Sequence, residues 1–218
     1  LLQGRVVFSG QQISWQTLFK TLQRYVPRLR SDTAKHMLLA VQEQLNLIPQ
    51  DTQADKLLEM FNECYYRNIL SPEEVLKALR QKILSDFDTY LFHYPGQAQF
   101  IPSFQLSRQM PIVGFDLPDL LSEAKQRQAW WDELQVQIPS MTCIPVLNDQ
   151  AVKAANLMPG QKQRLEMLTS HGKTLEDIAV AFAQDPLEIA KVFAKLIREG
   201  LITLTSSAVP AELPLSQG

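Results

Sequence analysis

The chain has 218 residues, of which 45% are hydrophobic and 20% are charged, and its formal net charge at pH 7 is −2. This composition is ordinary for a folded protein with one large or two small domains. The nearly balanced charge excludes the strong attraction to nucleic acid or to an anionic membrane surface that a basic protein has. No apolar run approaches the roughly 20 residues of a membrane helix, and Cys64 and Cys143 lie far apart, so we expect a cytoplasmic protein without membrane insertion.

Two short β-type segments stand near the start of the chain, at residues 5–8 and 12–15. Between them lies Ser9-Gly10-Gln11, in which Gly10 can supply the positive φ of a tight turn. The pattern predicts a β-hairpin that belongs to a small, mostly antiparallel sheet.

A helical block follows from about residue 17 to residue 87. Apolar residues recur in it at helical spacing, and Pro27 and Pro49 end the first two segments of this kind. Ser71-Pro-Glu-Glu74 has the composition of a capping box and predicts the start of a further helix. We expect this block to be a helical insert in the sheet domain.

The pattern changes again after Asp88. Residues 89–93 and 97–101 are strand-like and meet at Tyr94-Pro-Gly96, which predicts a second hairpin. From Asp116, apolar residues at helical spacing predict a longer helix that ends before Pro139.

The most regular pattern lies in residues 158–204. Thr174 precedes Asp177 in the arrangement of a helix cap, and Asp185-Pro186 marks a second helix start. With a helix before them and a strand at residues 201–204, these signals predict three short helices and a strand, the order of a helix-turn-helix with a reduced wing.

Together these elements predict an α+β protein. It would comprise a mixed domain at residues 1–150, with a small, mostly antiparallel sheet and a helical insert. A winged-helix-like trihelical unit would follow at residues 151–205. Residues 206–218 are expected to be a linker toward a further domain.

The trihelical unit raises the hypothesis of a DNA-binding transcription regulator. Residues 151–204 carry seven Lys and Arg against six Asp and Glu, which is no basic footprint. The helix that would enter the major groove also opens with Asp185 and Glu188, which would repel phosphates. These charges disfavour nucleic acid as a partner, and DNA binding remains the second hypothesis.

No catalytic or ligand-binding signature stands out in the sequence. Gly160 lacks the partner glycine of a phosphate-binding loop, and the three histidines have no His or Cys at metal-ligand spacing. Asp86 and Asp88 could pair as acid and base, but at a helix end we expect them to bind backbone groups and face water. The sequence predicts a protein that is not an enzyme and holds neither metal nor cofactor.

Large aromatic residues supply the candidates for a partner interface. Trp130 and Trp131 are adjacent on the predicted long helix, where neighbouring side chains point about 100° apart, so we expect one to be buried and the other partly exposed. Tyr66 follows Tyr65, which continues an apolar stripe, and is expected to be exposed together with Trp15. Packing between domains would explain the two tryptophans equally well. A third hypothesis is a small-molecule sensor with its ligand between the sheet and the tryptophans.

Four segments precede the trihelical unit in a characteristic order. They are Phe8-Ser-Gly-Gln-Gln-Ile-Ser-Trp15, Ser71-Pro-Glu-Glu-Val75, Ile83-Leu-Ser-Asp-Phe-Asp88 and Gly96-Gln-Ala-Gln-Phe100. In this order and spacing, most of the chain resembles the PATAN domain, the PatA N-terminal domain of cyanobacterial response regulators.

The resemblance implies a non-enzymatic output domain of a two-component system that acts through protein contacts in motility, phototaxis or cell-pattern control. The implied partners are the extension motor ATPase of type IV pili and, for some members, a blue-light-sensing flavin protein, and self-association stays open. The family's domain normally precedes a phosphoacceptor receiver domain. This chain has no receiver pattern, so the receiver is expected to follow Gly218.

Overall fold

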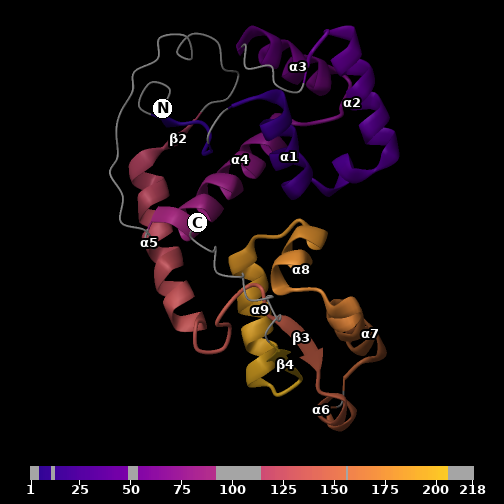
Figure 1. Cartoon of the computed structure of the whole chain (residues 1–218), viewed down its shortest axis with the longest axis vertical. Helices are drawn as coiled ribbons and strands as arrows, with labels where there is room; N and C mark the ends of the chain where they lie inside the picture. The colour runs from indigo at the N-terminus through magenta and orange to yellow at the C-terminus, as the bar shows by residue number, and fades with distance from the viewer. Residues whose placement is uncertain (1–4, 11–12, 49–53, 92–113, 156, 206–218) are drawn as a thin grey trace, which may run out of the picture. The chain divides into compact units, whose positions relative to one another are not determined.

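The computed structural model describes residues 5–10, 13–48, 54–91, 114–155 and 157–205. In this part the chain is mostly helical and contains two small antiparallel sheets, each of two strands (Figure 1). The α+β class is therefore confirmed in general terms. The two compact units of the chain are residues 1–130 with 182–185, and residues 131–181 with 186–218.

The sheet of the first unit joins segments far apart in the sequence. Strand β1 (Arg5–Val6) pairs antiparallel with β2 (Phe115–Asp116), and the Nε atom of Arg5 donates a hydrogen bond to the carbonyl of Gly114 at 2.6 Å. A Cβ atom at Gly114 would lie 2.8 Å from the Val6 carbonyl oxygen, closer than two such atoms can approach. Glycine is therefore required where the chain enters β2.

The predicted pairing of residues 5–8 with 12–15 is wrong, because the second segment leads into a helix. Helix α1 (Trp15–Tyr25) begins after Ser14, whose Oγ accepts a hydrogen bond from the Thr17 amide at 3.2 Å. The Thr17 hydroxyl accepts in turn from the Ser14 amide at 2.9 Å. This reciprocal capping satisfies two amides that a helix end leaves unpaired, and it outweighs the β propensity of Ile13 and Trp15.

The predicted helical block is present. In sequence it lies between the paired strands β1 and β2, and the predicted hairpins do not flank it in the described residues. It comprises α1, the 3₁₀ turn η1 (Pro27–Arg30), α2 (Asp32–Gln44), α3 (Ala54–Tyr66) and α4 (Pro72–Asp86). Ser31 caps α2, and the predicted capping box of Ser71 and Glu74 opens α4. The Ser71 hydroxyl accepts from the Glu74 amide at 3.2 Å, and the Glu74 carboxylate accepts from the Ser71 amide at 2.8 Å.

The predicted second hairpin is wrong where the structure describes it. Residues 89–91 belong to a π-helical turn, η2 (Phe87–Leu91), that continues α4. Residues 92–101 lie outside the described residues. No residue of this turn is fully buried, but the turn places Asp88, whose side chain is largely shielded from solvent, beside a buried arginine of α5 (Leu117–Leu134).

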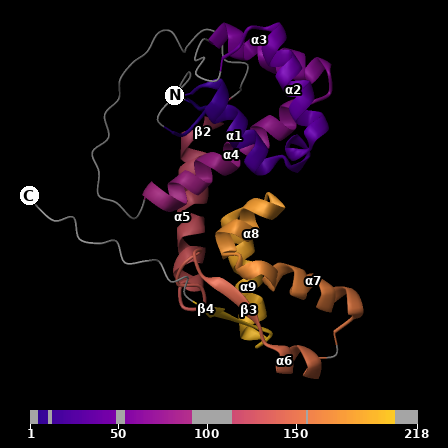
Figure 2. The same cartoon turned by 45° about the vertical axis from the view of Figure 1, so that its right-hand side comes forward.

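The core of the first unit lies among its helices. Apolar side chains of α1, α3 and α4 meet there, including Leu18, Leu22, Phe61 and Leu79, all fully buried. Figure 2 shows α1 and α4 crossing close together in this group. A smaller cluster packs Leu120 of α5 against the C-terminal half of α4.

The first division between the units falls between Trp130 and Trp131, inside α5, whereas the sequence pattern places a boundary near residue 150. Residues 139–149 contain Pro139 and Pro145, which argue against regular structure there. Part of this segment is instead a strand, β3 (Ile144–Leu147). Pro145 made this strand hard to predict, because proline disfavours strands other than those at a sheet edge. It is tolerated here because both strands of a two-stranded sheet are edges.

The second unit combines the β3–β4 sheet with short helices. The described elements after β3 are α6 (Asp149–Ala154), α7 (Pro159–Thr169), η3 (Ser170–Gly172), α8 (Leu175–Phe182), α9 (Pro186–Arg198) and β4 (Ile202–Thr205). Of these helices, α7 contacts β3 and α9 contacts β4. Strand β4 pairs antiparallel with β3, as Figure 2 shows, with Leu147 opposite Ile202. The three predicted helices and the final strand thus exist, and β3 supplies the strand that was missed.

Candidate functional site

Trp15 does not lie at the surface. Its side chain is 3% exposed, and its ring stacks on that of Phe19 with the centroids 5.4 Å apart. As the first residue of α1 it joins the core together with Leu18 and Leu22. The predicted exposure of Trp15 is therefore wrong, because its ring packs in the core of the first unit.

Tyr66 lies at the surface, as predicted. It is the last residue of α3 and is 85% exposed, whereas the preceding Tyr65 stacks on Phe61. Burial raises the pKa of Tyr65 to about 12. The two adjacent tyrosines therefore separate into one that packs inward and one that is presented to solvent.

Polar contacts fix the helix end that carries Tyr66. The next residue, Arg67, donates from Nε to the Glu63 carboxylate at 3.1 Å and from Nη2 to the side-chain oxygen of Gln44 at 2.5 Å. The second contact ties the end of α3 to the end of α2. Tyr66 is therefore displayed on a backbone that two side-chain contacts hold in place.

Trp130 and Trp131 are both half-buried, so the prediction that one is buried and the other partly exposed is wrong. The buried line of α5 runs instead through Leu120, Ala124 and Arg127. Trp131, four residues after Arg127, continues the spacing of this line towards the buried Leu134, and Trp130 lies beside the line. The Nε1 atom of Trp131 is buried without a hydrogen-bond partner among the described residues.

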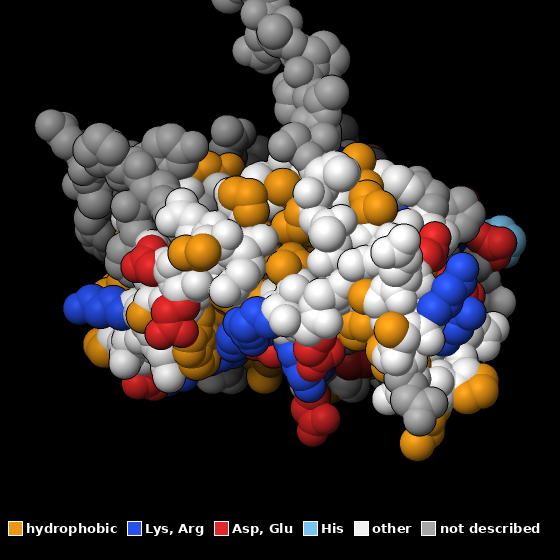
Figure 3. Space-filling model, turned by 90° about the horizontal axis from the view of Figure 1, so that it is seen from below, with side chains coloured by type: hydrophobic (Ala, Val, Ile, Leu, Met, Phe, Trp, Pro, Cys, Tyr) orange, Lys and Arg blue, Asp and Glu red, His pale blue; other side chains and the backbone are white. Residues whose placement is uncertain are grey.

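Other large hydrophobic side chains are exposed on both units. Those on or beside α2 are Met37, Leu39 and Ile48; those in the second unit include Val136, Met158, Met167 and Val192. Figure 3 shows one face of the chain, on which hydrophobic side chains are scattered among polar ones and Lys and Arg lie beside Asp and Glu. This face has no broad basic area.

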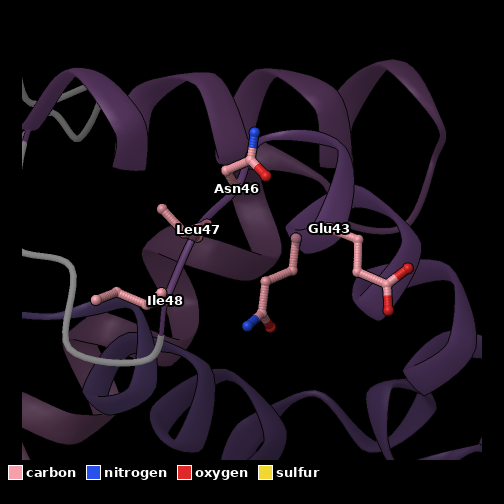
Figure 4. A pocket seen from close by; sticks show the side chains of 5 residues that line it. Glu43, Asn46, Leu47 and Ile48 are labelled. Carbon is pink, nitrogen blue, oxygen red and sulfur yellow. The ribbon is translucent and has the colours of Figure 1, made fainter.

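A shallow hollow of about 380 Å³ lies at the C-terminal end of α2. Gln42, Glu43, Asn46, Leu47 and Ile48 line it. The labelled side chains point in different directions and do not converge on one point (Figure 4). It therefore lacks the convergent polar groups that fix a small ligand, and it is lined by none of the aromatic candidates.

The structure also contains a buried ionic cluster that the sequence pattern did not reveal. Arg127 of α5 donates from Nε to Asp88 at 2.9 Å, from Nη1 to Asp185 at 2.5 Å and from Nη2 to Asp185 at 2.8 Å. The side chains of Arg127, Asp88 and Asp185 are 5%, 10% and 8% exposed. All three residues belong to the first unit.

The electrostatics of this cluster favour the charged guanidinium. Burial lowers the pKa of Arg127, but the hydrogen bonds and charges of Asp185 and Asp88 outweigh that effect and raise it above its ordinary value. Arginine suits this position because its planar fork can bind two carboxylates at once. The cluster is thus an arrangement for holding chain segments together.

The expectation that Asp86 and Asp88 bind backbone groups and face water is wrong for Asp88. Asp88 does not face water, because Arg127 binds it in the interior, and Asp86 pairs with Lys82 one helical turn earlier. Asp185 is not presented at a nucleic-acid-reading surface, because it is buried against Arg127. Spacing could have revealed the cluster, since Arg127 follows Leu120 and Ala124 on the apolar line of α5.

The remaining chemistry of the described residues is limited. Cys64 and Cys143 are buried and unlinked, and burial raises the pKa of the Cys64 thiol to about 12, which leaves it protonated at neutral pH. No group of three or more His, Cys, Asp or Glu residues in the described ranges could hold a metal ion. No helix in those ranges has the length and apolar composition needed to span a bilayer.

Comparison with known proteins assigns no family. No family model matches the chain, and neither a curated protein nor a solved structure gives a significant match.

Proposed function

We propose that this chain is a non-enzymatic adaptor that acts through protein contacts, with Tyr66 at the centre of its contact surface. The observation that carries the proposal is the 85% exposure of a tyrosine on a helix end held by polar contacts. Tyrosine is enriched among the residues that dominate binding energy, because its ring is large and loses little conformational entropy.

The surroundings of Tyr66 also suit an interface. Arg67 is held by Glu63 and Gln44, so little additional order is needed at this helix end on binding. A tyrosine ring buries about 150–250 Å² when it enters a partner's pocket. Trp130 and Trp131, both half-buried, are the secondary candidates.

The resemblance to the PATAN domain specifies the biological setting of the proposal. In it, the chain would be the cytoplasmic output domain of a cyanobacterial response regulator in phototaxis or motility control. Its partner would be the extension ATPase of type IV pili or a blue-light-sensing flavin protein.

A pull-down from a cyanobacterial lysate tests the proposal. The tagged full chain, a Tyr66→Ala variant and a Tyr90→Ala variant would be compared by mass spectrometry. Tyr90 is the matched control because it is also an exposed tyrosine, at 63%, but lies on η2. Recovery of the pilus ATPase or the photoreceptor by the native chain and by the Tyr90 variant, with loss in the Tyr66 variant, supports the adaptor and its surface.

Equal recovery of the partner by all three proteins would contradict the assignment to Tyr66. A Trp130→Ala variant then tests the secondary candidate. If none of the proteins recovers a specific partner, the adaptor hypothesis is rejected. Circular dichroism of each variant shows that the substitution leaves the fold intact.

DNA binding by a winged-helix-like unit is the second candidate. Its support is the order α7, α8, α9 and β4, with β4 paired to β3 in the place of a reduced wing. Charge weighs against it, because on α9 Lys191 pairs with Glu188 at 2.9 Å, and Lys195 lies 3.9 Å from Glu199, the residue after the helix. DNA binding predicts an affinity for duplexes that falls steeply with salt, and lack of binding at low salt would exclude it.

A further inference from the structure

The four residues 182–185 have an unusual place in the chain. They belong to the first unit, although the residues on either side of them, 131–181 and 186–205, belong to the second. Helix α8 ends in this segment and α9 begins directly after it, at Pro186. A short segment at the junction between α8 and α9 is therefore grouped with the first unit by its contacts.

Two arginines of the first unit hold this segment. Arg127 binds both carboxylate oxygens of Asp185 in the interior, and Arg24 of α1 donates to the carbonyl of Gln184 at 3.0 Å at the surface. The buried, bidentate contact is the stronger of the two, because solvent does not screen it. Asp185 is thus the main attachment of the segment.

The backbone of the segment is strained where it turns. Ala183 has a φ of 51°, a left-handed conformation that is unfavourable for a residue with a Cβ atom. The other described non-glycine residues with positive φ are Asn46 and Asn68, and asparagine tolerates this conformation better than alanine. Such strain persists only where surrounding contacts impose it, and here the arginine contacts follow within two residues.

Arg127 has a second carboxylate partner, Asp88, whose contact does not depend on Asp185. Asp88 binds the same guanidinium through Nε, from the π-helical turn η2. If Asp185 moved into water, Arg127 would keep a buried counter-charge. Separation of Asp185 therefore avoids the isolated buried cation that makes the loss of a simple buried pair so unfavourable.

From these observations we propose that residues 182–185 form a latch, a segment that is attached to the first unit in one state and detached in another. In the attached state Asp185 binds Arg127 and Ala183 is strained. In the detached state Asp185 is hydrated, Ala183 relaxes and Arg127 remains paired with Asp88. A fixed structural ion pair, by contrast, would come apart only when the whole first unit unfolds.

Hydrogen exchange of the full chain under native conditions tests the latch. The amides of residues 183–185 are expected to exchange by a local opening, faster than core amides of α1 such as those of Leu18 and Leu22. Asp185→Asn should accelerate exchange at 183–185 on the order of 100-fold, without a change in α1, because it weakens only the attachment.

Two further variants separate the latch from a fixed ion pair. Asp88→Asn removes a charge from the same arginine but does not touch the segment, so it should accelerate exchange at 86–91 and leave 183–185 slow. Ala183→Gly should slow exchange at 183–185, because glycine adopts a positive φ without strain.

The latch is overturned if Asp185→Asn and Asp88→Asn accelerate exchange equally across the first unit, since the cluster then acts as one structural block. It is equally overturned if residues 183–185 of the native chain exchange only as slowly as α1. If Asp185→Asn does not fold, the native chain and Ala183→Gly decide the question by the same measurement.

Discussion

Two arginine–carboxylate contacts in the first unit differ mainly in their access to water. Arg28 binds Glu74 through Nε at 2.8 Å, with side chains 47% and 31% exposed. Arg127 binds Asp88 and Asp185 with a similar fork, but its side chain is only 5% exposed. Geometry alone therefore does not set how much an ion pair stabilises the fold. Water screens the contact of Arg28 with Glu74, whereas the contacts of Arg127 are shielded from water.

The two contacts also differ in what they join. Glu74 already belongs to the capping box of α4, so Arg28 adds a partner to a carboxylate that the helix start has ordered. Arg127 joins α5 to η2 and to residues 182–185, which are 39 and 58 positions away in the sequence. The buried contact therefore joins segments of the first unit that are far apart in the sequence.

Removing the buried arginine should have the largest effect. Arg127→Met leaves the carboxylates of Asp88 and Asp185 buried without a cation, and we expect a loss of about 3–5 kcal/mol in the free energy of unfolding. Urea unfolding followed by circular dichroism measures it. Arg28→Met is the matched control and should cost at most about 1 kcal/mol. Equal losses would show that burial does not distinguish the two contacts.

Neutralising the whole cluster should restore most of that loss. In Arg127→Met combined with Asp88→Leu and Asp185→Leu, no buried charge remains, and exchange of a buried ionic group for apolar side chains is often neutral or stabilising by about 1–4 kcal/mol. The same unfolding measurement applies. A triple variant as unstable as Arg127→Met alone would mean that the residues contribute packing or backbone contacts beyond their charges.

A smaller effect is expected at the helix cap beside the exposed pair. Ser71→Ala removes the acceptor for the Glu74 amide, which is worth about 1 kcal/mol in the free energy of unfolding. Ser71→Gly serves as a comparison, since glycine at a cap costs only a few tenths of a kcal/mol relative to serine. If Ser71→Ala leaves the stability unchanged, the cap does not determine where α4 begins.

The smallest expected effect is a pH dependence at Glu74. The hydrogen bond from Arg28 lowers the pKa of this carboxyl below its ordinary value of 4.5, with the Ser71 amide contributing in the same direction. A lowered folded-state pKa means that the stabilisation is present above the unfolded value and is lost as pH falls through the folded one. The stability difference between native chain and Glu74→Gln, measured by urea unfolding, should therefore shrink from pH 7 to pH 3. A constant difference would contradict the assignment.

Helix positions were well predicted where local chemistry sets them. The starts of α4, α8 and α9 follow from serine, threonine and proline signals that act within one turn. The partners of the strands were not predicted, because β1 pairs with a strand more than 100 residues later and β3 contains a proline. Of the candidate interface residues, Tyr66 was correctly placed at the surface, whereas Trp15 was not.

Composition and local sequence patterns predicted an α+β protein of small net charge, with capped helices and an exposed Tyr66 beside an apolar stripe. These properties depend on composition and on residues close together in the chain. The burial of Trp15 and the binding of Asp88 and Asp185 by Arg127 became apparent from the folded chain alone. A buried charge depends on partners brought from distant segments, and no local pattern encodes which carboxylates will share one guanidinium.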